Sequence, residues 1–265
     1  MVPFTVSHAA AAWPFRRTPL ELSALVTGCF APDFPFFIFL EPHGFYGHTL
    51  PGIFLFDLPT SLVALWLFHA YIKPPLILIL PRGVQRRMKI SDEKFSFWPP
   101  ARLAIIVLSI LVGVCTHIAW DAFTHNLFWP YWHLAFLRKI VQLPVIGDIA
   151  MYNLLQYASS LFGIVAVAIW ILHWYRTTKP REQWKAMPFY AAEWRPFILA
   201  VPAVAICAAF VRAFIGVGIP TDAGSLLDFL VEVGISTITF FCVGLLACGI
   251  LLRQRAATPE AAGRR

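Results

Sequence analysis

Apolar residues concentrate in five stretches of at least 20 residues, separated by short segments that carry most of the charges. These stretches cover residues 49–72, 103–123, 154–175, 197–219 and 229–252. A helix needs about 20 mostly apolar residues to cross the hydrocarbon core of a bilayer. The pattern therefore predicts an all-α fold, a polytopic transmembrane helix bundle with about five spanning helices.

A further apolar stretch lies nearer the N-terminus, between Leu22 and Leu40. The sequence Pro32-Asp33-Phe34-Pro35 interrupts it, and a proline removes a backbone donor and breaks the helical hydrogen-bond ladder. We therefore expect two half-length helical pieces here. The predicted organisation is a single membrane domain, in which residues 1–48 form part of a site, residues 49–252 hold the five spans and residues 253–265 are a basic cytoplasmic tail.

Composition agrees with this interpretation. Hydrophobic residues make up 59% of the 265 residues, charged residues only 13%, and the mean hydropathy is +0.70. A water-soluble domain of this composition would have to hide more apolar surface than it can. The five cysteines lie in apolar segments without C-x-x-C spacing, which argues against thiolate metal sites and a disulfide framework. The chain is predicted to be an integral membrane protein whose immediate partner is the lipid bilayer.

The basic residues are distributed unequally between the two sides of the predicted bundle. The loops 73–102, 176–196 and 253–265 carry 16 of the 21 Lys and Arg residues, and the opposite side carries four. Because basic loops stay in the cytoplasm, the C-terminus is expected there, in a multi-pass protein of the inner (cytoplasmic) membrane, with residues 1–48 outside. This orientation explains the net charge of +7 without nucleic-acid binding. If residues 22–40 did span, His8 would be separated by the bilayer from the other candidate ligands.

Ionisable side chains interrupt the apolar pattern near the outer end of the second span. His117, Asp121 and His125 follow one another at intervals of four, so His117 and Asp121 share one helix face and His125 is expected to drift partly round it. His43 and His48 precede the first span on the same side of the membrane. The candidate metal ligands are His8, Asp33, His43, His48, His117, Asp121 and His125.

These residues offer imidazole nitrogens and carboxylate oxygens, a mixture that suits zinc first, with manganese or iron as alternatives. Asp33, His48 and Asp121 are the candidate catalytic residues, because a carboxylate or histidine beside a metal-activated water can move its proton. Ordinary structural roles are the alternative to metal binding for these residues. Asp33 could stabilise a turn, and His117 and Asp121 could link helices. Simple hydrogen bonds at the interface would explain three further histidines, His69, His133 and His173.

The order of these residues resembles a bacterial family known as membrane-bound metal-dependent hydrolases, on His8, Pro32-Asp33, His43-x4-His48-Thr49 and His117-x3-Asp121. Over most of its length the chain also resembles an uncharacterised bacterial membrane family, a domain of unknown function. That resemblance rests on Pro3-Phe-Thr-Val-Ser-His8, Ala31-Pro-Asp33, His117-x-x-Trp-Asp121-x-Phe-Thr-His125 and Tyr152-x3-Gln156-Tyr157-x-Ser159-Ser160. The resemblance implies a shared fold.

Arg212 lies inside the fourth predicted span, where an unpaired charge is costly. We expect it to pair with Asp57 or Glu232, or else to bind a substrate phosphate or a lipid headgroup near the metal.

Three functional hypotheses follow from these patterns. The first is a membrane-embedded metal-dependent hydrolase acting near the outer face on an ester or phosphoester of a lipid or envelope precursor. The second is a transporter or metal-handling protein that uses the same cluster. The third is a structural protein without catalysis. The sequence contains no nucleotide-binding glycine loop and no Gly-x-Ser-x-Gly motif, which argues against ATP-driven transport and a serine hydrolase.

Overall fold

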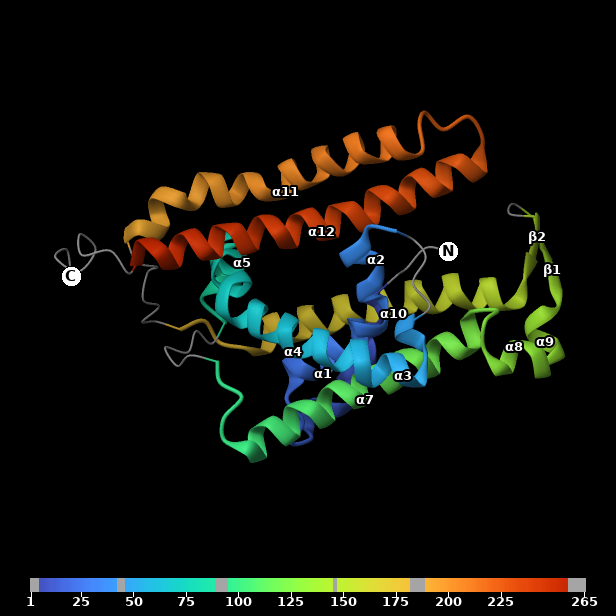
Figure 1. The fold of residues 1–265 in the computed structure, drawn as a ribbon, viewed down its shortest axis with the longest axis horizontal. Helices are drawn as coiled ribbons and strands as arrows, with labels where there is room; N and C mark the ends of the chain where they lie inside the picture. The colour runs from blue at the N-terminus through green and yellow to red at the C-terminus, as the bar shows by residue number, and fades with distance from the viewer. Residues whose placement is uncertain (1–4, 42–45, 89–94, 145–146, 182–188, 257–265) are drawn as a thin grey trace.

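A computed structural model describes the chain except for residues 1–4, 42–45, 89–94, 145–146, 182–188 and 257–265. The described residues are almost entirely helical (Figure 1). The N-terminal part holds η1 (Thr5–Arg17), α1 (Leu22–Phe30), η2 (Ala31–Asp33), α2 (Phe34–Phe39), η3 (Tyr46–His48), α3 (Leu50–Gly52), η4 (Ile53–Asp57), α4 (Leu58–Leu67), η5 (Phe68–Ile72), α5 (Lys73–Ile79) and α6 (Arg82–Gln85). The remainder holds α7 (Pro100–Thr124), α8 (Trp129–His133), α9 (Ala135–Arg138), β1 (Ile140–Leu143), β2 (Gly147–Ala150), α10 (Met151–Thr177), α11 (Phe189–Gly216) and α12 (Ala223–Ala256).

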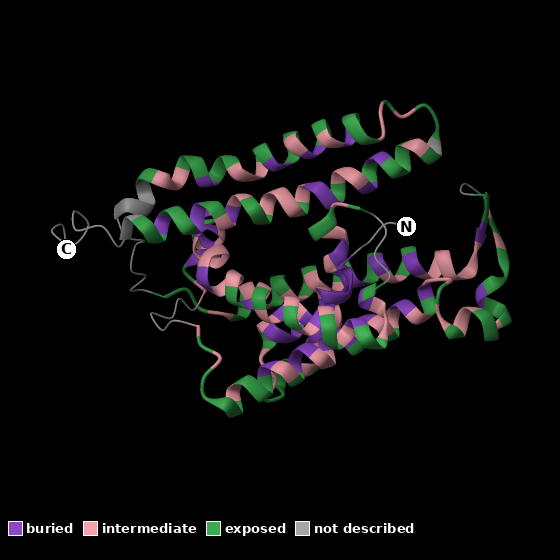
Figure 2. Cartoon of the chain, viewed as in Figure 1, coloured by how far each residue is buried: buried purple, intermediate pink, exposed green. Residues whose placement is uncertain are grey.

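Within the described residues, six helical segments are long and apolar enough to cross a membrane. They are Leu22–Phe39, Leu50–Ile79, Pro100–His133, Met151–Thr177, Glu193–Gly216 and Gly224–Gln254. The all-α polytopic bundle predicted from the hydropathy pattern is confirmed, and five of these segments contain the five predicted spans or nearly all of each. Figure 2 shows exposed residues along α10, α11 and α12. Large apolar side chains such as Phe162 on α10 and Ile215 on α11 are exposed. Such a surface is expected to face lipid rather than water.

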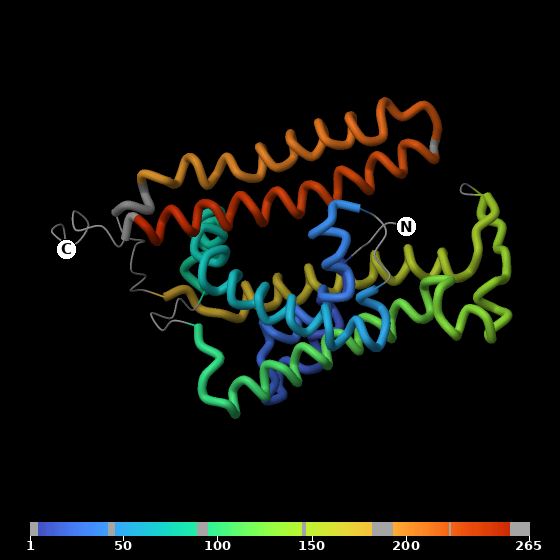
Figure 3. Tube along the Cα trace, viewed as in Figure 1, coloured from blue at the N-terminus to red at the C-terminus, as the bar shows by residue number. Residues whose placement is uncertain are grey.

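Residues 22–39 contain the two short helices that the sequence predicts, but these join into one segment that is long and apolar enough to cross a membrane. Pro32 and Pro35 each occupy the first turn of a new helix, where a missing N–H costs no hydrogen bond, and the short 3₁₀ turn η2 joins α1 to α2 without interrupting the helical path. The N-terminal end of this segment lies beside Ser109, part-way along α7, and not beside the first residue of α7. The backbone N–H of Glu21 donates to Ser109 Oγ at 2.9 Å, nine residues beyond Pro100. η1 packs against α1, α7 and α10, so the chain enters the bundle, turns and returns to the same end (Figure 3).

This return path removes the conflict between a helical segment at residues 22–39 and a shared site. His8 in η1 and His117 in α7 are neighbours, with ring centroids 3.9 Å apart. A membrane-spanning segment at residues 22–39 would therefore not separate His8 from the other candidate ligands, because η1 and α1 form a hairpin.

Two glycines allow α1 and α7 to pack with their backbones in contact. A Cβ atom on Gly28 would lie 2.2 Å from the carbonyl oxygen of Ile110, and one on Gly113 would lie 2.3 Å from that of Leu25. No larger residue fits at either position without moving a helix. Beside this contact lies the main apolar core, formed by Ala24, Ala31, Leu65, Ile106, Ile110 and Val114.

Helices α11 and α12 form a hairpin that lies along one side of the molecule (Figure 1). It contacts the remaining helices through η5 and α5 near one end and through α2 further along. At the second contact, Thr239 Oγ1 donates to the carbonyl oxygen of Phe37 at 2.9 Å. The first contact is tight because a Cβ on Gly249 would lie 1.9 Å from the carbonyl oxygen of Tyr71.

Candidate metal centre

Asp121 lies in the middle of the predicted histidine and aspartate cluster. Its Oδ2 atom is 3.2 Å from Nε2 of both His48 and His117, and its Oδ1 atom is 3.4 Å from His8 Nε2 and 3.6 Å from His125 Nδ1. Asp33 completes the cluster. Its Oδ1 atom is 3.6 Å from His117 Nε2 and 3.9 Å from His48 Nε2. The chain thus brings together donors that are as much as 117 positions apart in the sequence.

The donor spacing suits a shared ion. Zinc ligands lie about 2.0–2.1 Å from the metal, which for a tetrahedron places neighbouring ligand atoms roughly 3.3 Å apart. Two groups of donors have all their ligand atoms within 4.8 Å of one another: His8, His117 and Asp121, and Asp33, His48 and His117. His117 belongs to both. These donors fit a divalent ion by type and by spacing, with more ligands than a single tetrahedral site requires.

His117 is held in the orientation that a ligand needs. Its side chain is fully buried, and its Nδ1 atom lies 2.7 Å from the carbonyl oxygen of Cys29. Because a carbonyl only accepts, Nδ1 carries the proton and Nε2 presents a lone pair. Nε2 makes no hydrogen bond within the described part of the chain. A second hydrogen bond that fixes the tautomer in this way is typical of metal-binding histidines.

Asp33 is supported in a similar way. It closes the η2 turn, is almost fully buried, and accepts on its Oδ2 atom a hydrogen bond from Thr5 Oγ1. Its Oδ1 atom is directed toward His48 and His117. Hydrogen bonds to a ligating carboxylate fix which oxygen faces the metal.

His8 enters the centre from η1. Its ring stacks on His117 and meets the edge of Trp120, with centroids 5.7 Å apart. Burial, and then the neighbouring His117, lower the pKa of His8 to about 3. The imidazole is therefore neutral at physiological pH, which is the form that can act as a ligand.

His125 reaches the cluster because α7 ends at Thr124. The expected drift of His125 round the helix assumed that the helix continues, but His125 has extended backbone angles as the C-cap residue. Its Nδ1 atom faces Asp121 and Thr124, and its Nε2 atom lies 3.2 Å from Gln156 Nε2 on α10. At 17%, its side chain is the most exposed of the described donors. His43, the remaining predicted ligand, lies outside the described residues.

For three further histidines the sequence predicts only ordinary hydrogen bonds. His69 forms a hydrogen bond with Ser23 Oγ and stacks on Phe95, away from the cluster. His133 contacts the backbone of Trp129 within α8, and His173 is exposed on α10. Their positions agree with that interpretation.

Sequence patterns did not single out several groups that support the centre. Thr5 and the Cys29 carbonyl hold Asp33 and His117, but neither is a ligand type. Gln156 stands in one of the motifs that carry the resemblance to the uncharacterised membrane family. The polar pattern of the N-terminal segment could have indicated Thr5, since it lies three residues before His8. A backbone carbonyl leaves no signal in a sequence.

Arg212 pairs with Glu232, as one of the two expected alternatives. Its Nη1 group contacts the Glu232 carboxylate and donates to Ser236 Oγ at 3.2 Å, while Nη2 donates to the carbonyl oxygen of Leu40 at 2.6 Å. Asp57, the other candidate, does not take part in this ion pair. Arg212 therefore ties α11 and α12 to the end of α2.

Comparison with known families gives one match. The family described as a domain of unknown function, DUF4184, matches residues 2–250. The chain belongs to this family. No curated protein and no solved structure matches the chain. Membership in DUF4184 agrees with the expected uncharacterised family, and the resemblance to the membrane-bound hydrolases stays a prediction.

Proposed function

We propose that this DUF4184 protein is a membrane-embedded metal-dependent hydrolase. The observation that carries the proposal is the geometry of His117, whose protonated Nδ1 is fixed by the Cys29 carbonyl while Nε2 faces two carboxylates. Zinc fits this mixed nitrogen and oxygen donor set best, and manganese or iron also fits. A divalent ion held there would supply Lewis acidity and lower the pKa of a water molecule toward neutrality.

The chain's own residues would divide the work between holding the ion and moving protons. His117 has a fully buried imidazole and His8 stacks on it, and both would serve as ligands. His48 Nε2 lies within 4 Å of a carboxylate oxygen of both Asp33 and Asp121, so one of these three residues can accept the proton of an attacking water while the others bind the ion. His125, on the more exposed side, can contact the substrate or its leaving group.

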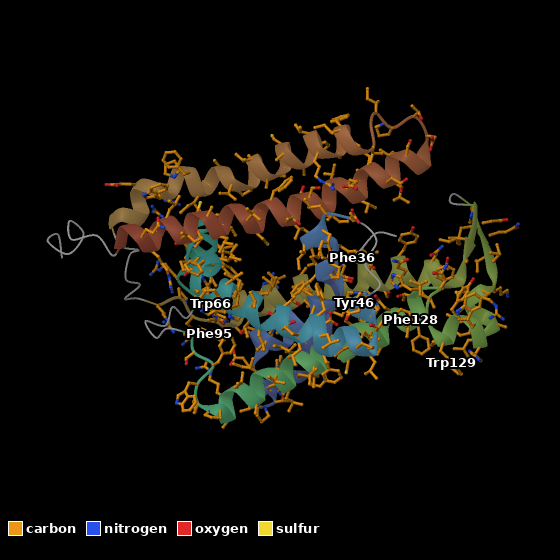
Figure 4. The ribbon with its side chains drawn as sticks, in the orientation of Figure 1. Phe36, Tyr46, Trp66, Phe95, Phe128 and Trp129 are labelled. Carbon is orange, nitrogen blue, oxygen red and sulfur yellow. The ribbon has the colours of Figure 1, made fainter. Side chains whose placement is uncertain are left out.

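The substrate we propose is an ester or phosphoester of a lipid or envelope precursor. The cluster occupies the last two turns of α7, beside α8 and its exposed Trp129 and Trp132, which are side chains typical of a membrane interface. Figure 4 shows Tyr46 and Phe128 near this end of α7, and the Phe128 ring contacts His48. An amphipathic substrate could reach such a site without leaving the bilayer.

We further propose that the protein lies in the bacterial inner membrane with its C-terminus in the cytoplasm. The unequal distribution of Lys and Arg supports this orientation. The η1–α1 hairpin is compatible with it, because residues 1–48 need not place His8 on the other side of the bilayer.

The packing along α7, between the cluster and the Pro100 end of the helix, disfavours the alternative function of ion transport through the cluster. Ile106, Ile110 and Val114 on α7 and Leu65 on α4 are completely buried between the cluster and the opposite end of α7. Ser109 is the one buried polar side chain on α7 between Pro100 and Val114, whereas an ion path would need a series of polar groups. A purely structural cluster would instead be expected to satisfy its buried polar atoms, yet His117 Nε2 and Asp121 Oδ1 have no hydrogen bond in the described structure.

A reconstitution experiment tests the hydrolase proposal. The purified protein is stripped with a chelator, reloaded with zinc, manganese or iron, and assayed in micelles against chromogenic carboxylic esters and phosphoesters. We expect cleavage that depends on the added metal and falls at least 100-fold in Asp121→Asn. Stoichiometric metal binding without cleavage of either ester class would favour metal handling instead.

A further inference from the structure

Asp57 is a completely buried acid that has no assigned role in the cluster. It ends η4, a π-helical turn, and its side chain is 0% exposed. Neither carboxylate oxygen has a hydrogen-bond partner among the described residues, and the same holds for the hydroxyl of Ser61 one turn later. A buried acid without partners is costly in a protein interior and more so in a bilayer, so its presence there points to a function.

The position of Asp57 follows from the prolines around it. Pro59 has no backbone N–H and its ring crowds the preceding turn, so the helix cannot keep a regular hydrogen-bond ladder here. The chain instead widens into the π turn Ile53–Asp57 before α4 continues. π turns of this kind occur frequently at functional sites, because the extra residue redirects the side chains around it.

Asp57 lies where the two turns that deliver Asp33 and His48 meet. A Cβ atom added to Gly47 would lie 2.9 Å from Asp57 Oδ1 and 2.6 Å from the carbonyl oxygen of Pro32. Gly47 directly precedes His48, and Pro32 directly precedes Asp33. The elements η2, η3 and η4 also contact one another in pairs. The carboxylate of Asp57 therefore sits one layer behind two of the proposed ligands, against the backbone that carries them.

We propose that Asp57 is a positioning residue of the metal centre, a carboxylate packed behind the η2 and η3 turns whose negative charge favours the ligand arrangement around a bound cation. Asp33 and Asp121 already offer two negative charges to a divalent ion. A third carboxylate in the next layer attracts the cation through a low-dielectric interior and orients the ligand turns toward it. Gly47 is required because any side chain there would separate Asp57 from the Pro32 turn.

This inference rests on the proposed function only in requiring a bound metal ion, and it does not require hydrolysis. Asp57→Asn keeps the shape of the side chain and removes its charge. We expect the zinc dissociation constant, measured by competition with a chelating dye, to rise about 10–100-fold, the usual range for groups behind a metal ligand. The melting temperature of the metal-free protein should not fall, because the substitution removes a buried acid that has no partner.

The matched control is Asp228→Asn, which changes an exposed acid on α12 and should leave zinc affinity unchanged. Gly47→Ala is a second variant that acts on the same junction and should also weaken zinc binding. Visible spectra of the cobalt-loaded protein should change in Asp57→Asn and not in Asp228→Asn, since they report ligand geometry.

Two results would overturn the positioning role. One is zinc affinity and a cobalt spectrum in Asp57→Asn that equal those of the wild type. The other is a loss of affinity that merely accompanies a lower melting temperature of the metal-free protein, which would indicate general support of the fold. Wild-type protein that binds no zinc or cobalt would instead remove the proposed function itself.

Discussion

Hydrogen bonds determine which atoms of His117 and Asp33 face the centre of the cluster. His117 uses one ring nitrogen on the Cys29 carbonyl and leaves the other beside Asp33 and Asp121. Thr5 binds the oxygen of Asp33 that faces away from the cluster. The sequence was sufficient to nominate the described residues that cluster around Asp121, because ionisable residues inside apolar stretches are rare. It could not identify the Cys29 carbonyl, since every residue has a backbone carbonyl, and its only signal for Thr5 was a hydroxyl three residues before His8.

The contact between Thr5 and Asp33 leads to a prediction at this scale. Thr5→Val keeps the shape of the side chain and removes the donor to Asp33 Oδ2. We expect zinc affinity to fall about 10-fold or more, because an unsupported carboxylate turns more freely. Isothermal titration in micelles measures it, with Thr177→Val as a control whose hydroxyl binds only the local backbone of α10. Equal affinities of Thr5→Val and the wild type would contradict the supporting role of Thr5.

The hydropathy pattern predicts the long helices but not the π turns or the N-terminal hairpin. Each of the five long apolar stretches is helical, because only a helix satisfies its backbone within lipid. The segment 22–39 divides at Pro32 and Pro35 as expected, but both prolines begin new helical turns, so its two halves stay joined. The π turns η4 and η5 were not predicted, and neither was the hairpin of η1 and α1. These features depend on contacts between distant segments, which periodicity along the chain does not report.

The glycine contact between α1 and α7 carries a prediction at the scale of elements. Gly113→Ala places a Cβ against the backbone of Leu25 and must push the two helices apart. We expect a loss of roughly 1–3 kcal/mol of stability, together with weaker zinc binding, because His117 lies one turn further along α7. Thermal unfolding in detergent measures the first effect.

A matched substitution tests whether position decides the effect. A Cβ on Gly234 in the middle of α12 would meet nothing within 4 Å, so Gly234→Ala should be neutral or stabilising by up to about 1 kcal/mol. If both alanine variants behaved alike, the close approach of α1 and α7 would not be a determinant of the site.

At the scale of the whole molecule, the α11–α12 hairpin is attached to the helices that carry the site. Arg212 connects Glu232, Ser236 and the Leu40 carbonyl, so one guanidinium joins α11, α12 and the end of α2. The depth of each residue within its predicted span was enough to nominate Asp57 and Glu232 as partners of Arg212. It could not choose between them, because depth says nothing of which helix faces lie together.

The Arg212 ion pair predicts a non-additive pair of substitutions. Arg212→Met leaves Glu232 unpaired and should cost roughly 1–3 kcal/mol, less than a fully buried pair because the arginine side chain is 32% exposed. Replacing both residues by methionine should restore part of this loss. Unfolding curves of the single and double variants in detergent provide the test, and strictly additive effects would show that the two charges are not coupled.

The most direct test of the account is the metal content of the purified protein. Elemental analysis of the wild type, His117→Ala and Asp121→Ala, each confirmed as folded by circular dichroism, measures bound zinc, manganese and iron per chain. The proposed centre predicts at least one ion per wild-type chain and a loss of most of it in both variants. Equal metal content in all three proteins, or none in any of them after loading, would contradict a metal centre at Asp121.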